Sequence, residues 1–170
     1  MVFFNDPVPC PDPALRAGAV SALGRIADPR GRRAVTVALA DREPGVRAAA
    51  ATALSAFPLP ESAARLRGML EREERVEIRI RAAATLVDLF NTGVVEALDT
   101  LLSLAGSKTE DRRVRMEALK VLSSLPPAEA RGIAAGMVED PDLRMAQAAS
   151  RLAGDAIAGV GDAGVPEALA

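Results

Sequence analysis

The chain contains no histidine, tryptophan or tyrosine, and it has a single cysteine, Cys10. The missing histidine excludes histidine metal sites, Ser/His and Cys/His nucleophilic pairs, and the commonest acid/base side chain near neutral pH. One cysteine cannot form a disulfide within the chain, which favours a reducing compartment, so we expect a cytoplasmic protein. The composition therefore argues against an enzyme, and we expect no catalytic residue, cofactor or metal.

Long apolar runs and an excess of positive charge are also missing. No stretch approaches the roughly 20 consecutive apolar residues that a membrane-spanning helix needs, and no secretory signal pattern opens the chain. The 21 basic residues face 23 acidic ones, which gives a net charge of −2. Because such a balance provides no field that attracts a nucleic-acid backbone, we expect neither a membrane nor a nucleic acid as partner.

What the sequence does contain is a repeat. An apolar residue followed by arginine recurs every 29 to 36 residues in DPALRAGAVSAL, EPGVRAAAATAL, VEIRIRAAATL, DRRVRMEALKVL and DPDLRMAQAASRL. The repeated arginines are Arg16, Arg47, Arg79, Arg115 and Arg144. A leucine stands seven residues after each of the first four. A period of this length is typical of a solenoid built from helix pairs.

Each repeat begins with residues that start helices. An acid stands four residues before the arginine in four of the copies, as Asp12, Glu43, Asp111 and Asp140. Such an acid can cap free amide groups or face the positive end of a helix dipole. In three copies a proline follows at the first helical position, where its missing amide hydrogen has no cost. We therefore interpret these acids and arginines as structural repeat positions.

A second amphipathic segment follows the first helix of each of the first four copies. These segments are RRAVTVALA, ESAARLRGML, VVEALDTLLSLA and AEARGIAAGMV, with apolar residues at helical spacing. The fifth copy lacks a convincing second helix, because the chain becomes rich in glycine from Gly154. The sequence thus predicts an all-α solenoid of four helix pairs and a partial fifth. We expect an extended arm over residues 1–11, the solenoid over 12–158 and a flexible tail over 159–170.

Residues 12–26, DPALRAGAVSALGRI, resemble the repeat pattern of the HEAT-like family in its short bacterial form, which is also seen in phycobilisome lyase subunits. The resemblance extends over roughly residues 12–152. It implies a right-handed superhelix, in which the first helix of each pair lies on the convex side and the second lines the concave side. Since the family consists mainly of scaffolds and adaptors, the resemblance implies a non-catalytic protein-interaction module with a protein partner.

Polar positions of the second helices are the candidates for partner binding on the concave side. We predict that the binding residues are Arg33, Thr36, Arg65, Glu96, Asp99 and Arg131. The second segment of the second repeat and the residues after it carry four arginines, at positions 65, 67, 72 and 75, and four glutamates, at 61, 71, 73 and 74. This pattern predicts a solvated face of balanced charge. The incomplete fifth repeat would expose an apolar side, so we expect weak self-association through the C-terminal end.

The first 17 residues, MVFFNDPVPCPDPALRA, resemble a different family, the catalytic domain of bacterial class III adenylate/guanylate cyclases. The positions that bind metal and read the base in that family have no counterpart here, so no nucleotide chemistry carries over. We interpret residues 1–11 as a cyclase remnant, or Met1 as an internal methionine of a longer cyclase–solenoid protein. Another interpretation is an arm that covers the first repeat with Phe3 and Phe4.

Three alternative functions follow from these resemblances. The chain could be a regulatory segment of a nucleotide cyclase signalling protein. It could be a chromophore-lyase subunit, although it has no histidine, tyrosine or tryptophan to hold or stack on a tetrapyrrole. The DNA glycosylase relatives of the HEAT-like family fit least, because a net charge of −2 does not supply a basic groove.

Overall fold

The computed structural model describes residues 10–90, 95–125 and 145–151. Within these ranges the regular structure is helical and contains no strand. No helix of the described ranges is both long enough and apolar enough to cross a membrane. The chain divides into two compact units, Met1–Leu89 and Phe90–Ala170. The predicted all-α solenoid of helix pairs is confirmed.

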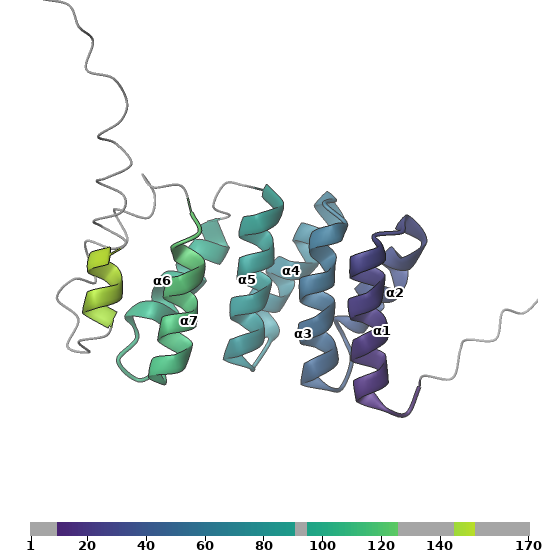
Figure 1. Ribbon diagram of the computed structural model, residues 1–170, viewed down its shortest axis with the longest axis horizontal. Helices are drawn as coiled ribbons and strands as arrows, with labels where there is room; N and C mark the ends of the chain where they lie inside the picture. The colour runs from purple at the N-terminus through teal and green to yellow at the C-terminus, as the bar shows by residue number, and fades with distance from the viewer. Residues whose placement is uncertain (1–9, 91–94, 126–144, 152–170) are drawn as a thin grey trace, which may run out of the picture. The chain divides into compact units, whose positions relative to one another are not determined.

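The first unit is built from alternating first and second helices of successive repeats. Its elements are α1 (Pro13–Ile26), η1 (Pro29–Gly31), α2 (Arg32–Ala38), α3 (Pro44–Ala53), η2 (Leu54–Ala56), α4 (Pro60–Arg72) and α5 (Val76–Phe90). Figure 1 shows α1, α3 and α5 side by side in one row, with α2 and α4 behind them. The row in front holds the helices that carry the repeated arginines, and the row behind holds the second helices.

The starts of α1 and α3 have the local chemistry that the sequence indicates. Asp12 is the N-cap of α1, where its carboxylate accepts hydrogen bonds from the N–H groups of Ala14 and Leu15 at 2.8 and 3.4 Å. Proline occupies the first turn of both helices. Glu43 stands at the N-cap position of α3, but its side chain makes no capping hydrogen bond. Glu43 therefore stabilises the helix start through its negative charge near the positive end of the helix dipole and not through a capping hydrogen bond.

Small side chains allow α1 and α3 to pack closely. A methyl group added at Gly24 of α1 would lie 2.7 Å from the Cβ of Ala53 in α3. The core of the unit is aliphatic, and its largest fully buried side chains are Val35, Val46, Leu54, Leu66, Ile80 and Leu86. Removal of this apolar surface from water is the main force that stabilises the helix pairs.

In the second unit, α6 (Val95–Gly106) packs against α7 (Arg112–Leu122). Their contact buries aliphatic side chains that include Leu101, Leu104, Leu119 and Leu122. Asp111 caps α7, because its carboxylate accepts a 2.7 Å hydrogen bond from the N–H of Arg113. A further helical segment covers residues 145–151, in which Met145 and Ala149 are fully buried.

Candidate functional site

Arg16 and Arg47 make the same side-chain contact one repeat apart. The Nε and Nη2 atoms of Arg16 donate to the two carboxylate oxygens of Asp41, both at 2.8 Å. In the next repeat, the same two atoms of Arg47 donate to Glu73 at 2.6 and 2.8 Å. All four side chains are less than one-fifth exposed, between 6% and 19%. Because both pairs are bidentate and shielded, each is stronger than an ordinary surface ion pair.

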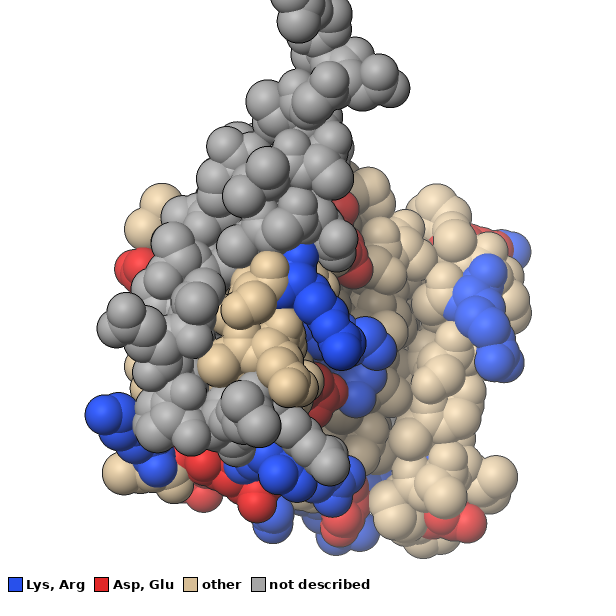
Figure 2. All heavy atoms as spheres, turned by 60° about the vertical axis from the view of Figure 1, so that its left-hand side comes forward, with Lys and Arg blue, Asp and Glu red and all other residues tan. Residues whose placement is uncertain are grey.

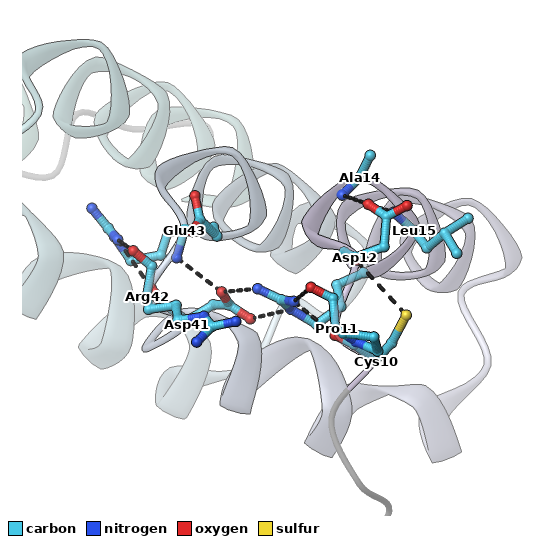
Figure 3. Close-up of polar contacts among 10 residues, drawn as sticks. Cys10, Pro11, Asp12, Ala14, Leu15, Asp41, Arg42 and Glu43 are labelled. Carbon is cyan, nitrogen blue, oxygen red and sulfur yellow. Dashed lines mark hydrogen bonds and ion pairs between the residues drawn. The ribbon is translucent and has the colours of Figure 1, made fainter.

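The third nitrogen of each guanidinium binds the main chain that precedes its own helix. Nη1 of Arg16 donates to the carbonyls of Cys10 and Pro11 at 2.7 and 3.3 Å. Nη1 of Arg47 donates to the carbonyl of Asp41 at 3.0 Å and to that of the following residue at 3.1 Å. Figure 3 shows Asp41 with two sets of hydrogen bonds: its carboxylate accepts from Arg16, and its carbonyl accepts from Arg47. Each arginine thus ties the main chain before its own helix to the connection that precedes the next repeat.

Hydrogen bonds from the arginines lower the pKa of both carboxyls. The bonds from Arg16 hold the pKa of Asp41 below its ordinary value, and those from Arg47 do the same for Glu73, against partial desolvation. Main-chain N–H groups add to the effect, because Glu43 donates to Asp41 at 2.9 Å and Arg75 donates to Glu73 at 3.1 Å. Both carboxylates are ionised at neutral pH, so neither is poised to act as a general acid or base there.

Asp41 and Glu73 were not predicted as the partners of the repeated arginines. The acids predicted to matter stand four residues before each arginine, whereas each actual partner stands six residues before the arginine of the next repeat. The equivalent position before Arg115 is Thr109, so the acid occurs too rarely to stand out as a repeated position. Glu73 was also assigned to a balanced solvated face, and this assignment is wrong, because Glu73 is bound to Arg47.

The other repeated arginines make different contacts. The Nε atom of Arg79 in α5 is buried and has no hydrogen-bond partner among the described residues. Arg115 in α7 is 6% exposed, and its Nε donates to the carbonyl of Ala105 at 3.0 Å. Arg144 and Asp140 lie outside the described residues. The bidentate arrangement is therefore a property of the first two copies within the described part of the chain.

A groove of about 750 Å³ opens between α2 and α4. The α2 side, including the turn after it, contributes Thr36, Leu39, Ala40 and Asp41. The α4 side contributes Ala64, Arg65, Gly68, Met69 and Arg72. Arg47 and the connection after α4, with Glu73, Glu74 and Arg75, complete the lining. The same groove therefore includes one of the two bidentate pairs and the acid of the other.

The structure brings two of the six predicted binding residues together in this groove, Thr36 of α2 and Arg65 of α4. Arg33 is exposed on α2 but does not line the groove. Glu96 and Asp99 are exposed on α6, which belongs to the second unit. Arg131 lies outside the described residues. Sequence reasoning did not single out Arg72, Arg75 or Met69 for the groove, since helical phase alone does not show where two helices leave a hollow.

The described surface offers mixed charge and no cluster suited to a metal. Figure 2 shows basic and acidic side chains next to one another along the lower edge of the view. Among the residues that the structure describes, no group of three or more cysteine, aspartate or glutamate side chains could hold a metal ion. The groove, with its guanidinium groups and small side chains, is chemically suited to binding a polar chain segment.

The comparison with family models finds one match that covers this site. Residues 8–87 match the family described as HEAT repeats. The matched range contains both arginine–carboxylate pairs and the groove between α2 and α4. The comparison with curated proteins finds no match. Together with the helix pairs described above, the family match shows that residues 8–87 are similar to HEAT repeats.

Proposed function

We propose that the chain is a non-catalytic scaffold of the cytoplasm, and that a protein partner binds the groove between α2 and α4. HEAT repeats generally mediate protein–protein interaction. The observation that carries the proposal is the groove itself, lined by the second helices of two consecutive repeats. Surfaces of this kind, built from neighbouring repeats, are the ones that solenoids use for binding.

The bidentate pairs support the proposal because they prepare the groove before a partner arrives. Asp41 and Glu73 lie at its edge, and each is fixed by a bidentate contact to an arginine. A surface whose side chains and connections are already ordered loses less conformational entropy on binding. The groove is therefore suited to a partner that folds onto it, because most of the conformational entropy lost on binding is then lost by the partner.

Photo-crosslinking in the protein's own cells tests the proposal. A photoreactive amino acid is placed at Thr36, which lines the groove, and in a separate variant at Ala14, which is exposed on α1 and does not line it. We expect a discrete protein adduct from position 36 and none of that mass from position 14. An adduct from Ala14 only, or none at position 36, would contradict the proposal.

Two glycines provide a matched steric test of the same site. Gly68 of α4 lines the groove and Gly18 of α1 does not, and a Cβ added at either position has no atom within 4 Å. Leucine favours both helices over glycine, so neither Gly68→Leu nor Gly18→Leu should destabilise the fold. We expect Gly68→Leu to abolish the adduct from position 36 and Gly18→Leu to preserve it. An adduct that survives both changes would place the partner outside the groove.

The alternative of a regulatory segment in a class III nucleotide cyclase rests on residues 1–17 and on one contact. The hydrogen bonds from Arg16 to the carbonyls of Cys10 and Pro11 fasten part of this stretch to the first repeat. A segment held in this way could transmit movement between a preceding domain and the repeats. The intact mass of the endogenous protein separates the two functions, because 17.7 kDa favours the scaffold and a much larger mass favours the cyclase.

The remaining predictions from the sequence stay open. The phycobilisome-lyase type of the repeats and the chromophore-lyase function have no supporting observation among the described residues. Self-association through the C-terminal end concerns residues 152–170, which lie outside the described ranges, as do residues 1–9 of the N-terminal arm. Analytical ultracentrifugation of the full chain tests self-association directly.

A further inference from the structure

We propose that the partner segment in the groove between α2 and α4 is acidic, with apolar side chains among its acids. This inference rests on the proposed function and adds the chemistry of the partner. It comes from the charges that remain in the groove once the internal ion pairs are taken into account.

Two of the three acids that line the groove are already neutralised. Asp41 is held by Arg16, and Glu73 is held by Arg47, at distances of 2.6 to 2.8 Å. Glu74 is the remaining acid of the lining. The lining also contains three arginines that take part in no ion pair among the described residues, Arg65, Arg72 and Arg75. The lining therefore has more free positive than negative charge, although the chain as a whole has a net charge of −2.

The arginines are placed to meet a chain that lies along α4. Arg65 and Arg72 are seven residues apart, which puts them on the same face of the helix two turns from each other. Both are exposed, and the described residues contain no hydrogen-bond or ion-pair partner for either guanidinium. A free guanidinium offers a planar fork of donors that matches a carboxylate. Acidic side chains of a partner are therefore the natural ligands of this face.

Apolar surface lies beside the arginines. Leu39 and Ala40 line the α2 side, and Ala64 lines the α4 side, where Met69 lies beneath and is 7% exposed. A partner with apolar side chains between its acids would cover this surface as well as the charges. Single-stranded nucleic acid is a poorer match, because the lining contains no aromatic side chain on which a base could stack.

Fluorescence anisotropy with a defined probe tests the inference. The probe is a fluorescein-labelled peptide of alternating Glu and Leu, and its control is the same peptide with Gln in place of each Glu. We expect saturable binding of the acidic peptide that weakens as salt is raised. The double variant Arg65→Glu/Arg72→Glu should weaken binding by about tenfold or more. The double variant Arg25→Glu/Arg81→Glu changes the net charge equally at exposed positions outside the groove, and it should leave binding unchanged.

Several results would overturn the inference. Equal weakening by both double variants would mean that only the bulk charge acts. Equal affinity for the Gln peptide would mean apolar recognition without charge. Tighter binding of single-stranded DNA, lost in Arg65→Glu/Arg72→Glu, would assign the groove to nucleic acid. Tighter peptide binding after Asp155→Asn/Asp162→Asn/Glu167→Gln would assign it to the chain's own acidic tail.

The crosslinking experiment separates failure of the inference from failure of the proposed function. If the adduct from position 36 persists in Arg65→Glu/Arg72→Glu, a protein occupies the groove without needing these charges, and only the inference fails. If the unaltered chain gives no adduct from position 36, the proposed function itself fails. Loss of the adduct in this variant, with retention in Arg25→Glu/Arg81→Glu, supports both.

Discussion

Arg16 and Asp41 are joined by two parallel hydrogen bonds of 2.8 Å, although 25 residues separate them in the sequence. The carbonyl of the same aspartate accepts a hydrogen bond from Arg47, which also donates to the carboxylate of Glu73. An unbroken series of contacts therefore runs from Cys10 to Glu73 along one edge of the first two repeats. This edge borders the groove, so the stability of the repeats and the shape of the groove depend on the same residues.

Loss of the shielded Arg16 should destabilise the chain more than loss of an exposed arginine. Arg16→Met leaves the shielded carboxylate of Asp41 without its partner, and we expect a measurable fall in the free energy of unfolding. Arg30→Met is the matched control, because Arg30 also pairs with an aspartate, Asp28, but its side chain is 91% exposed. That change should have little effect on the free energy of unfolding. Urea denaturation measures both, and similar losses would contradict the assigned role of Arg16.

Acid should destabilise the protein through the same carboxyls. The pKa values of Asp41 and Glu73 are lower in the folded chain than in the unfolded chain, because arginine hydrogen bonds favour the ionised form. Their contribution is complete above the ordinary carboxyl pKa and disappears as the pH falls through the lowered values. As the pH falls below about 4, the free energy of unfolding of Asp41→Asn/Glu73→Gln should therefore decrease less than that of the unaltered chain. Parallel stability curves for the two proteins would rule this contribution out.

Two glycines of α1 should respond oppositely to alanine. Gly24→Ala places a methyl group 2.7 Å from the Cβ and 2.9 Å from the Cα of Ala53, so α1 and α3 must separate and stability must fall. Gly18→Ala meets no atom within 4 Å, and it should raise stability by about 0.5–1 kcal/mol through helix propensity. Thermal melting compares the two, and a Gly24→Ala protein that melts above the unaltered chain would disprove the close packing.

Replacement of the two acids at the helix starts by alanine should lower the stability of the fold by different amounts. Asp12→Ala removes the acceptor for the N–H groups of Ala14 and Leu15, which should cost about 1 kcal/mol. Glu43→Ala removes an acid that makes no capping hydrogen bond, so only a few tenths of a kcal/mol from the helix dipole should be lost. Equal losses in chemical denaturation would show that capping is not what distinguishes Asp12.

The fold was readable from the sequence because its signal is periodic. The interval between Arg16 and Arg47, the leucines seven residues later and the prolines at helix starts all report local structure, and local structure repeats. The groove and the ion pairs depend on which connection meets which helix. That relation joins residues about 25 positions apart and occurs twice among the described residues, so no repeated position revealed Asp41 or Glu73.

The candidate site was predictable only in outline. Thr36 and Arg65 were chosen from helical phase, and both line the groove. The basic surplus was hidden because the sequence pairs the arginines of α4 with nearby glutamates. The fold removes Glu73 from that balance by binding it to Arg47, a residue of the preceding helix. Charge that looks balanced along the chain is therefore unbalanced in space.

Occupation of the groove by an acidic partner segment is tested most directly by amide hydrogen exchange of the full chain, with and without the Glu/Leu peptide. We predict slower exchange in residues 36–41 and 64–75 when the peptide is bound, and no change in α6 and α7. Unchanged exchange in both groove segments, or protection centred on α6 and α7, would contradict the assignment of the groove as the binding site.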